Sequence, residues 1–332
     1  MAEPDVDLAS VTAFAGLGPG LLASLRASLE PFAVAAGEAL FRQNDPAEGM
    51  HVITRGCVRI QGRTLADGLS HLADIGAGEV VGEFGLVDQG RRSASAEALE
   101  PTAGYFMPRE QFERLLFIGD PAAQAVAREI RALACRRTRA TLAAMADEAV
   151  GPGERRDVAA EPGAVRSRGE EGVLEMLQAL HQFRHFKPVE TAEVLAAVEV
   201  LEAPRGAVLA SAGEAAAGLW IVLRGAVRTG LDRAGGVEQL LVHGPGKLVG
   251  VVAATDGGAQ PARLDVRENA LLLRLPRPAA HALADDARPT AVKLLDLVSK
   301  QLVADLRALS RHQGRKRSMA ALNATAGASA HV

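Results

Sequence analysis

One internal repeat constrains the fold of this 332-residue chain more than any other feature. The segment GEALFRQNDPAEGMHVITRGCVRI, which begins at Gly37, aligns at a constant offset with GAVLASAGEAAAGLWIVLRGAVRT, which begins at Gly206. Further along, GEVVG ending at Gly82 aligns with GKLVG ending at Gly250, so a single deletion keeps the two copies in register. Because the units of a solenoid run only about 20 to 50 residues, a repeat this long indicates a duplicated domain.

Each copy shows the pattern of short strands followed by a helix. Apolar and polar residues alternate in MHVITRGCVRI and in LWIVLRGAVRT, and glycines punctuate both, which predicts an antiparallel barrel or sandwich. Helical stretches follow at Pro121–Met145 and Thr290–Arg311. Apolar residues line one face of the second stretch. Such a stripe fits a docking or dimer face as well as burial against the chain's own barrel.

These patterns predict two domains and two connecting segments. The first domain covers residues 1–148, and the second covers residues 173–312. Residues 149–172 are rich in glycine, proline and charge without an apolar period, so we expect a linker there. Residues 313–332 include a basic stretch and are expected to form a flexible tail.

The composition excludes several classes of function. Hydrophobic residues make up 48% of the chain and charged residues 23%, enough for packed cores. A net charge of −3 gives no overall attraction to nucleic acid or anionic membranes. Two cysteines, Cys57 and Cys135, cannot form a disulfide framework and fit a reducing compartment. Without a signal-peptide pattern or a membrane-spanning apolar run, we expect a cytoplasmic protein.

The segment VVGEFGLVDQGRRSASAEA, from Val80 to Ala98, carries the most functional information. It ends one strand, makes a short helical turn and returns through a basic pair into the next strand. It resembles the phosphate-binding cassette of cyclic nucleotide-binding domains, and its spacing is similar to that of catabolite activator protein-like sensors, whose loop is one residue longer. The family's Gly-Glu, apolar stretch and Arg-Ser-Ala pattern is met here by Gly82, Glu83, Phe84, Gly85, Leu86, Arg92, Ser93 and Ala94.

The resemblance carries expectations for fold and function. It implies a mainly β fold with flanking α-helices, built as two double-stranded β-helix (jelly-roll) barrels in tandem. It also implies a receptor for a cyclic mononucleotide, cAMP or cGMP, with no catalysis and no metal. The helix after the first barrel would close over the base and pass the signal to an effector protein, and the chain is expected to form a homodimer. Possible base contacts on that helix are Leu133, Ala134 and Arg137.

The residue types suit that chemistry. A cyclic phosphodiester carries one negative charge, and burying it is costly unless a cation and oriented N–H groups replace water. Arg92 would supply the cation, and the turn near Phe84 would present free backbone N–H groups. Glu83, an acceptor when ionised, suits the ribose 2'-hydroxyl. Arg91 is a competing phosphate ligand, but the Arg-Ser-Ala tripeptide favours Arg92.

The second copy departs from the pattern at the positions that matter. Val251 replaces Glu83 and Gln260 replaces Arg92, and a proline follows Gln260. Arg263 lies three residues past the matching place and is a weak substitute. We therefore expect a degenerate domain that serves packing, dimerisation or transmission.

Two alternatives to a receptor remain at this point. The duplicated barrels could be an interaction scaffold that binds no nucleotide, or a metal-dependent enzyme of the cupin type. The candidate metal ligands are His181 and His185, which lie one helical turn apart. No third ligand is evident beside them, so the support for a metal site is weak. The residues after Arg311 are too few for a DNA-binding helix-turn-helix, so DNA is not an expected partner.

Overall fold

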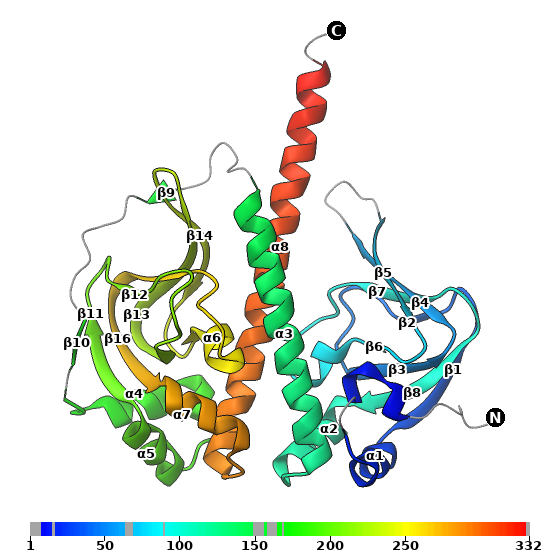
Figure 1. Ribbon diagram of the computed structural model, residues 1–332, viewed down its shortest axis with the longest axis horizontal. Coiled ribbons are helices and arrows are strands. Elements are labelled where there is room, and N and C mark those ends of the chain that lie inside the picture. Colours follow the sequence, from blue (N-terminus) through cyan, green and yellow to red (C-terminus); the bar gives the residue numbers. More distant parts are fainter. Residues whose placement is uncertain are drawn as a thin grey trace. The chain divides into compact units, whose positions relative to one another are not determined.

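The structure is a computed structural model, and the chain divides into two compact units within it (Figure 1). The first unit holds the residues up to Arg131 and those from Arg317 onward, and the second holds Ala132–Lys316. No helix among the residues described is long and apolar enough to cross a membrane. The structure describes residues 8–14, 17–63, 69–88, 90–148, 156–157, 165–167 and 169–329.

The first unit contains a β-barrel of two four-stranded antiparallel sheets. One sheet has the order β1-β8-β3-β6 and the other β2-β7-β4-β5. Apolar residues that alternate along the strands point into the barrel, where Ile53, Val58, Val81 and Ala96 form a buried cluster. The strands are β1 (Glu30–Val34), β2 (Ala39–Phe41), β3 (Gly49–Arg55), β4 (Cys57–Arg63), β5 (Leu69–Gly76), β6 (Val80–Val81), β7 (Ser95–Ala98) and β8 (Thr102–Pro108).

Short helices flank this barrel at both ends of its sequence. The long helix α3 (Pro121–Asp147) begins in the first unit and ends in the second, because the boundary between the units lies at Arg131. The other elements are η1 (Leu8–Ser10), η2 (Thr12–Phe14), α1 (Pro19–Arg26), η3 (Glu83–Leu86) and α2 (Arg109–Phe117).

The second unit repeats the barrel with longer strands. Its eight strands form one sheet with the order β10-β11-β16-β13-β14-β9, where β12 also pairs with β16 and β15 with β13. The strands are β9 (Arg156–Asp157), β10 (Arg166–Ser167), β11 (Glu199–Ala203), β12 (Val208–Ala210), β13 (Gly218–Arg233), β14 (Gly236–His243), β15 (Leu248–Val249) and β16 (Arg263–Pro276).

Helices pack around this second barrel as they do around the first (Figure 1). The prediction of two mainly β domains in tandem, each followed by a helix, is confirmed. The helical elements are α4 (Val173–Ala179), η4 (His181–Phe183), α5 (Pro188–Ala197), α6 (Val251–Asp256), α7 (Arg277–Ala282), η5 (Leu283–Asp285) and α8 (Pro289–Ser329).

The second half of α3 belongs to the second unit, although the chain up to residue 148 was expected to form the first domain. Leu142 and Met145 are buried in a cluster with Leu231, Leu240 and Leu309. Arg233 donates hydrogen bonds to the carbonyl oxygens of Met145 and Ala146, both at 2.6 Å. The apolar face of α3 therefore gains partners in the second barrel, which moves the boundary into the helix.

The two connecting segments also differ from expectation where they are described. Most of the expected linker at residues 149–172 lies outside the described residues, but β9 and β10 within it pair with β14 and β11. Residues 313–329, expected as a flexible tail, continue α8. Five alanines in this stretch favour a helix, and Lys316 donates a hydrogen bond to Glu238 at 2.8 Å, so α8 extends past the buried Leu309.

Candidate functional site

The predicted cassette forms a tight turn between β6 and β7. Gly82 has the left-handed conformation, with φ of 76°, and the 3-10 helix η3 starts directly after it. Side chains at that φ are strained, so glycine fits the position. Within η3, Glu83, Gly85 and Leu86 are buried and Phe84 is half-buried. The expected helical turn is thus present, and its glutamate faces inward.

Arg92 lies beneath this turn. Its side chain is only 6% exposed, while the neighbouring Arg91 is exposed and donates from Nη1 to the carbonyl oxygen of Asn44 at 2.8 Å. Arg92 Nη1 donates to the carbonyl oxygen of Gly82 at 3.2 Å. A Cβ added at Gly82 would clash with the same nitrogen, and one at Gly85 would lie 3.0 Å from it. The cassette glycines therefore leave the space that the guanidinium fills.

An aromatic ring also contacts the guanidinium of Arg92. The Arg92 Cζ lies 4.1 Å from the centroid of the Phe41 ring, a distance typical of a cation–π contact. The backbone N–H of Arg92 donates to the Asp45 carbonyl oxygen at 2.8 Å, and the Arg92 carbonyl accepts from the Asn44 N–H at 3.0 Å. Backbone hydrogen bonds and stacking on Phe41 together hold this cation in place.

Arg92 also lines a pocket of about 440 Å³ in the first barrel. Its volume lies within the range of small-molecule sites, about 300–1,000 Å³. The aromatic rings of Phe32, Phe41 and Phe106 surround the imidazole of His51 there, with centroid distances of 5.1, 5.9 and 4.7 Å. The remaining lining residues are Glu30, Pro31, Leu40, Asp45, Pro46 and Glu48.

His51 is an uncharged polar group in this pocket. Burial, with a smaller effect of the Arg92 charge, lowers the pKa of His51 to about 3, so the imidazole is neutral at physiological pH. Its buried Nδ1 has no hydrogen-bond partner among the residues that the structure describes. A buried nitrogen of this kind is a potential hydrogen-bonding group for a bound ligand.

The remaining predicted residues are placed as follows. Ser93 is exposed, and Ala94 after it is buried. Leu133, Ala134 and Arg137 lie on the part of α3 that belongs to the second unit, where Ala134 is buried and Arg137 exposed. Gly82, Gly85 and Arg92 thus lie together in the first unit. The three candidate base contacts belong to the second unit.

In the second barrel the same turn covers an indole. Gly250 matches Gly82 and has φ of 77°, but a Cβ added there would lie 2.6 Å from Cζ3 of Trp220, which aligns with His51. Val251 is buried in the Glu83 position and Gln260 in the Arg92 position. Arg263 is engaged elsewhere, since its guanidinium contacts Asp265 at 3.1 Å and Asp232 at 3.4 Å.

The candidate metal ligands His181 and His185 both contact an arginine side chain. The Arg184 guanidinium lies 3.0 Å from Nε2 of His185 and 3.3 Å from Nδ1 of His181. Within the described part of the chain, no cluster of three or more His, Cys, Asp or Glu side chains could hold a metal ion.

The sequence did not predict the cluster of aromatic rings around His51, which Phe32, Phe41 and Phe106 form. The alternating pattern of MHVITR places His51 on the inward face together with Ile53, and this period was the available signal. The other rings come from β1, β2 and β8, which are distant in sequence, so no local pattern connects them.

Comparison with known proteins finds one family. The model of the cyclic nucleotide-binding domain matches residues 31–118 and 190–286, together more than half of the chain. The N-terminal domain of a transcriptional regulator from Streptomyces coelicolor is 30% identical, covering 43% of this chain and 100% of that one, with a TM-score of 0.37. The regulatory domain of Toxoplasma gondii PKA with cAMP is 15% identical, covering 82% and 87%, with a TM-score of 0.31.

Curated relatives match over part of their length. Acetyltransferase Pat of Mycolicibacterium smegmatis is 34% identical over 112 residues, which is 34% of this chain and 33% of that protein. The CRP-like cAMP-activated global transcriptional regulator of Mycobacterium tuberculosis is 31% identical over 107 residues, 32% of this chain and 47% of the regulator. The chain thus spans a third to about half of the length of these relatives.

Proposed function

Because this chain belongs to the cyclic nucleotide-binding domain family, we propose that it is a regulatory receptor for a cyclic mononucleotide, cAMP or cGMP, bound in the first barrel. One observation carries the proposal: the buried guanidinium of Arg92 lies beneath the Gly82–Leu86 turn and lines a pocket of about 440 Å³. The M. tuberculosis relative is named as cAMP-activated, which supports the choice of ligand class.

The cassette residues have separate tasks in this proposal. The phosphate would replace the Gly82 carbonyl oxygen as the partner of Arg92 Nη1, and a charge-assisted contact of that kind is among the stronger hydrogen bonds. Stacking on Phe41 keeps the guanidinium plane fixed before the ligand arrives, which lowers the ordering cost of binding. Glu83 would accept from the ribose 2'-hydroxyl, and Ser93 would donate to the phosphate or the base.

The signal would leave the first barrel through α3. In the second unit, Arg139 on this helix contacts the segment that corresponds to the cassette: Nε and Nη2 lie 2.6 and 2.7 Å from the Asp256 carboxylate, and Nη1 donates to the Ala259 carbonyl oxygen at 2.7 Å. Cys135 Sγ lies 3.8 Å from the Val252 carbonyl oxygen. A shift of α3 would therefore pull on residues 252–259.

Calorimetric titration of the full chain with cAMP and cGMP tests the ligand. We expect saturable binding that Arg92→Ala weakens by at least a hundredfold, because removing one partner of a buried charge pair costs about 3–5 kcal/mol. Arg91→Ala is the matched control and should retain binding, since that side chain is exposed. Absence of saturable binding to the wild-type chain would instead favour an interaction scaffold.

Hydrogen exchange tests the signal path. Nucleotide should change the exchange of residues 251–260 in the wild-type chain, and Arg139→Gln should remove that change while leaving nucleotide affinity within about threefold. If the exchange of this segment changes equally in the variant, the Arg139 contact is not the route.

The proposal also includes the chain's setting. The downstream partner would be a protein and not DNA, the chain would act in the cytoplasm as a homodimer, and neither barrel would catalyse a reaction. Light scattering with and without nucleotide measures the mass of the assembly, and a monomer under both conditions would contradict the dimer.

A further inference from the structure

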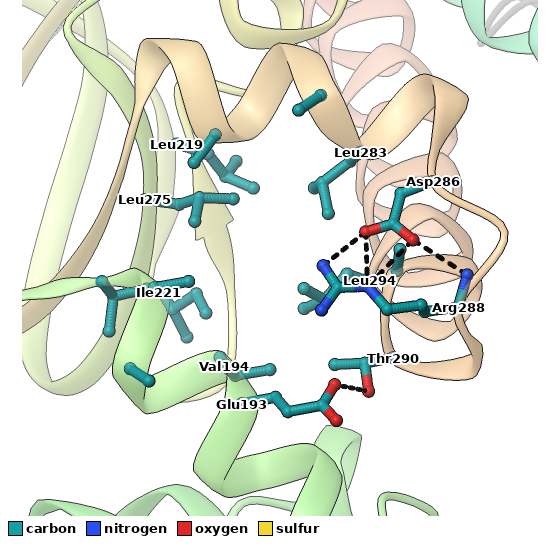
Figure 2. A pocket seen from close by; sticks show the side chains of 16 residues that line it. Glu193, Val194, Leu219, Ile221, Leu275, Leu283, Asp286, Arg288, Thr290 and Leu294 are labelled. Atoms are coloured by element: carbon teal, nitrogen blue, oxygen red, sulfur yellow. Dashed lines mark hydrogen bonds and ion pairs between the residues drawn. The ribbon is translucent and has the colours of Figure 1, made fainter.

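A second pocket, of about 340 Å³, lies in the second unit outside the barrel interior (Figure 2). It is bounded by the start of β13, the end of β16, and the helices α5, α7 and α8. Leu219 and Ile221 face it from β13, whereas Trp220 between them points beneath the turn at Gly250. Because side chains alternate along a strand, this pocket and the second cassette lie on opposite faces of β13.

The walls of the pocket are aliphatic and built from short side chains. Buried leucines and Ile221 form the floor, and Figure 2 shows them converging on one empty space. The pocket opens to solvent, since Ala196, Ala197 and Ala282 in its lining are exposed. A mostly apolar pocket with a few polar groups is typical of small-molecule sites. Alanines on the helices leave the room, namely Ala196, Ala197, Ala279, Ala282 and Ala291.

Polar groups gather at one side of the pocket (Figure 2). Glu193 accepts a hydrogen bond from the Thr290 hydroxyl at 2.7 Å. Asp286 holds the guanidinium of Arg288 by contacts of 2.6 to 3.1 Å, and the Arg288 hydrogen bonds lower the pKa of Asp286. The side of the pocket thus carries two carboxylates, Asp286 and Glu193, and one cation, Arg288. Because Asp286 neutralises the charge of Arg288, the negative charge of Glu193 remains.

Helix dipoles do not reverse this balance. The amino-terminal end of α8 begins at Pro289, next to Thr290, and the carboxyl-terminal end of α5 closes the pocket at Ala197. The first end carries partial positive charge and the second partial negative charge, so their contributions oppose each other. The side-chain charges then decide which head group the rim accepts.

We propose that this pocket binds an amphipathic small molecule, with its apolar body against the aliphatic floor and a cationic, hydrogen-bond-donating head at Glu193. Its chemical class is that of an alkylammonium compound. A fatty carboxylate would place like charge beside Glu193 and Asp286. The site is separate from the proposed nucleotide pocket and does not depend on it.

Calorimetric titration of the full chain with octylamine, octanol and octanoate tests the proposal, because the three probes share a tail and differ in the head. We expect octylamine to bind most tightly, octanol about fivefold more weakly and octanoate most weakly. Glu193→Gln should remove the preference of octylamine over octanol and leave octanol affinity unchanged, since glutamine still accepts the Thr290 hydrogen bond.

Filling the pocket gives the second arm. Ala279→Leu should weaken octylamine binding at least tenfold, and Ala197→Leu, from another helix, should do the same if the first variant does not fold. Ala192→Leu is the matched control, because Ala192 is an exposed residue of α5 that does not line the pocket. Octanoate binding as tightly as octylamine, no saturable binding, or affinities that neither filling variant changes would each overturn the proposal.

Discussion

The two barrels share one turn but fill the space beneath it differently. In the first, Gly82 covers the guanidinium of Arg92, stacked on Phe41 beside an open pocket. In the second, Gly250 covers the indole of Trp220, which belongs to an apolar cluster with Val222, Val249 and Leu264. The two copies therefore share the backbone of the turn, while the space beneath it holds a cation in the first barrel and a packed aromatic ring in the second.

The glycine turn alone does not make a phosphate site. Both glycines have nearly the same φ, 76° and 77°. The side chains packed against each glycine decide whether an anion can be desolvated beneath the turn. We infer that the second barrel takes no charged nucleotide, and four experiments test this difference between the barrels.

The largest expected effect comes from Trp220→Ala. Removing a fully packed indole leaves a cavity and should lower the free energy of unfolding by about 3–5 kcal/mol. Urea unfolding followed by circular dichroism measures the loss, and Trp220→Phe, which keeps a ring, should cost less. A loss below about 1 kcal/mol would show that the indole does not fill the space beneath Gly250.

The second experiment measures how the free energy of unfolding depends on pH through His51 in the first barrel. The pKa of His51 is lowered to about 3, so between pH 6.5 and 3 the unfolded state binds more protons than the folded state. Stability is then lost as the pH falls through this window, by about 3 kcal/mol at pH 4. His51→Phe should remove this part of the acid destabilisation.

Comparing the unfolding free energies of both proteins at pH 7 and pH 4 measures that difference. His243 in the second unit, whose pKa burial lowers to about 4, acts in the same direction and remains in both proteins. Equal acid destabilisation of the wild type and the variant would mean that the His51 imidazole is already protonated or solvated.

Glu83→Gln should weaken nucleotide binding by about 10- to 100-fold, as expected for a lost charged hydrogen bond worth about 1.5–3 kcal/mol. A 2'-deoxy cyclic nucleotide should lose affinity for the wild type and little further for the variant. Val251→Ala is the control at the matching place in the second barrel and should leave binding unchanged. If removal of the 2'-hydroxyl lowers the affinity of the wild type and of the variant by the same factor, Glu83 does not bind the ribose.

The smallest expected effect belongs to Gln260→Arg. Restoring the missing cation should not add a second binding site, because Trp220 still fills the space under Gly250. Titration should give the same stoichiometry of one nucleotide per chain. A second equivalent of bound nucleotide would show that charge, and not packing, inactivated this barrel.

The sequence predicted what depends on local pattern. The repeat and the strand periods located both barrels, and the cassette predicted the turn at Gly82 and the inward-facing Arg92. The cluster of aromatic rings around His51 was not predictable in the same way, since Phe32 and Phe106 contact His51 from strands that are far apart in sequence. An alternating pattern identifies an inward residue but not its neighbours.

The predicted boundary of the first domain at residue 148 differs from the division into compact units at Arg131, and the reason is related. An amphipathic helix shows that it has an apolar face without showing which surface covers that face. Leu142 and Met145 find their partners on β13, β14 and α8, which only the tertiary structure reveals. The extension of α8 to Ser329 was not predicted either, because the basic stretch after Arg311 was interpreted as part of a solvated tail.

The position of α3 determines how this protein can be divided for study. A fragment ending at residue 148 would carry Leu142 and Met145 into water, and one starting at residue 173 would uncover Leu231 and Leu240. Both pieces would tend to aggregate when expressed alone. Protease cleavage after α3, in contrast, would leave the halves joined by that helix, so a nicked chain should still elute from a column as one particle.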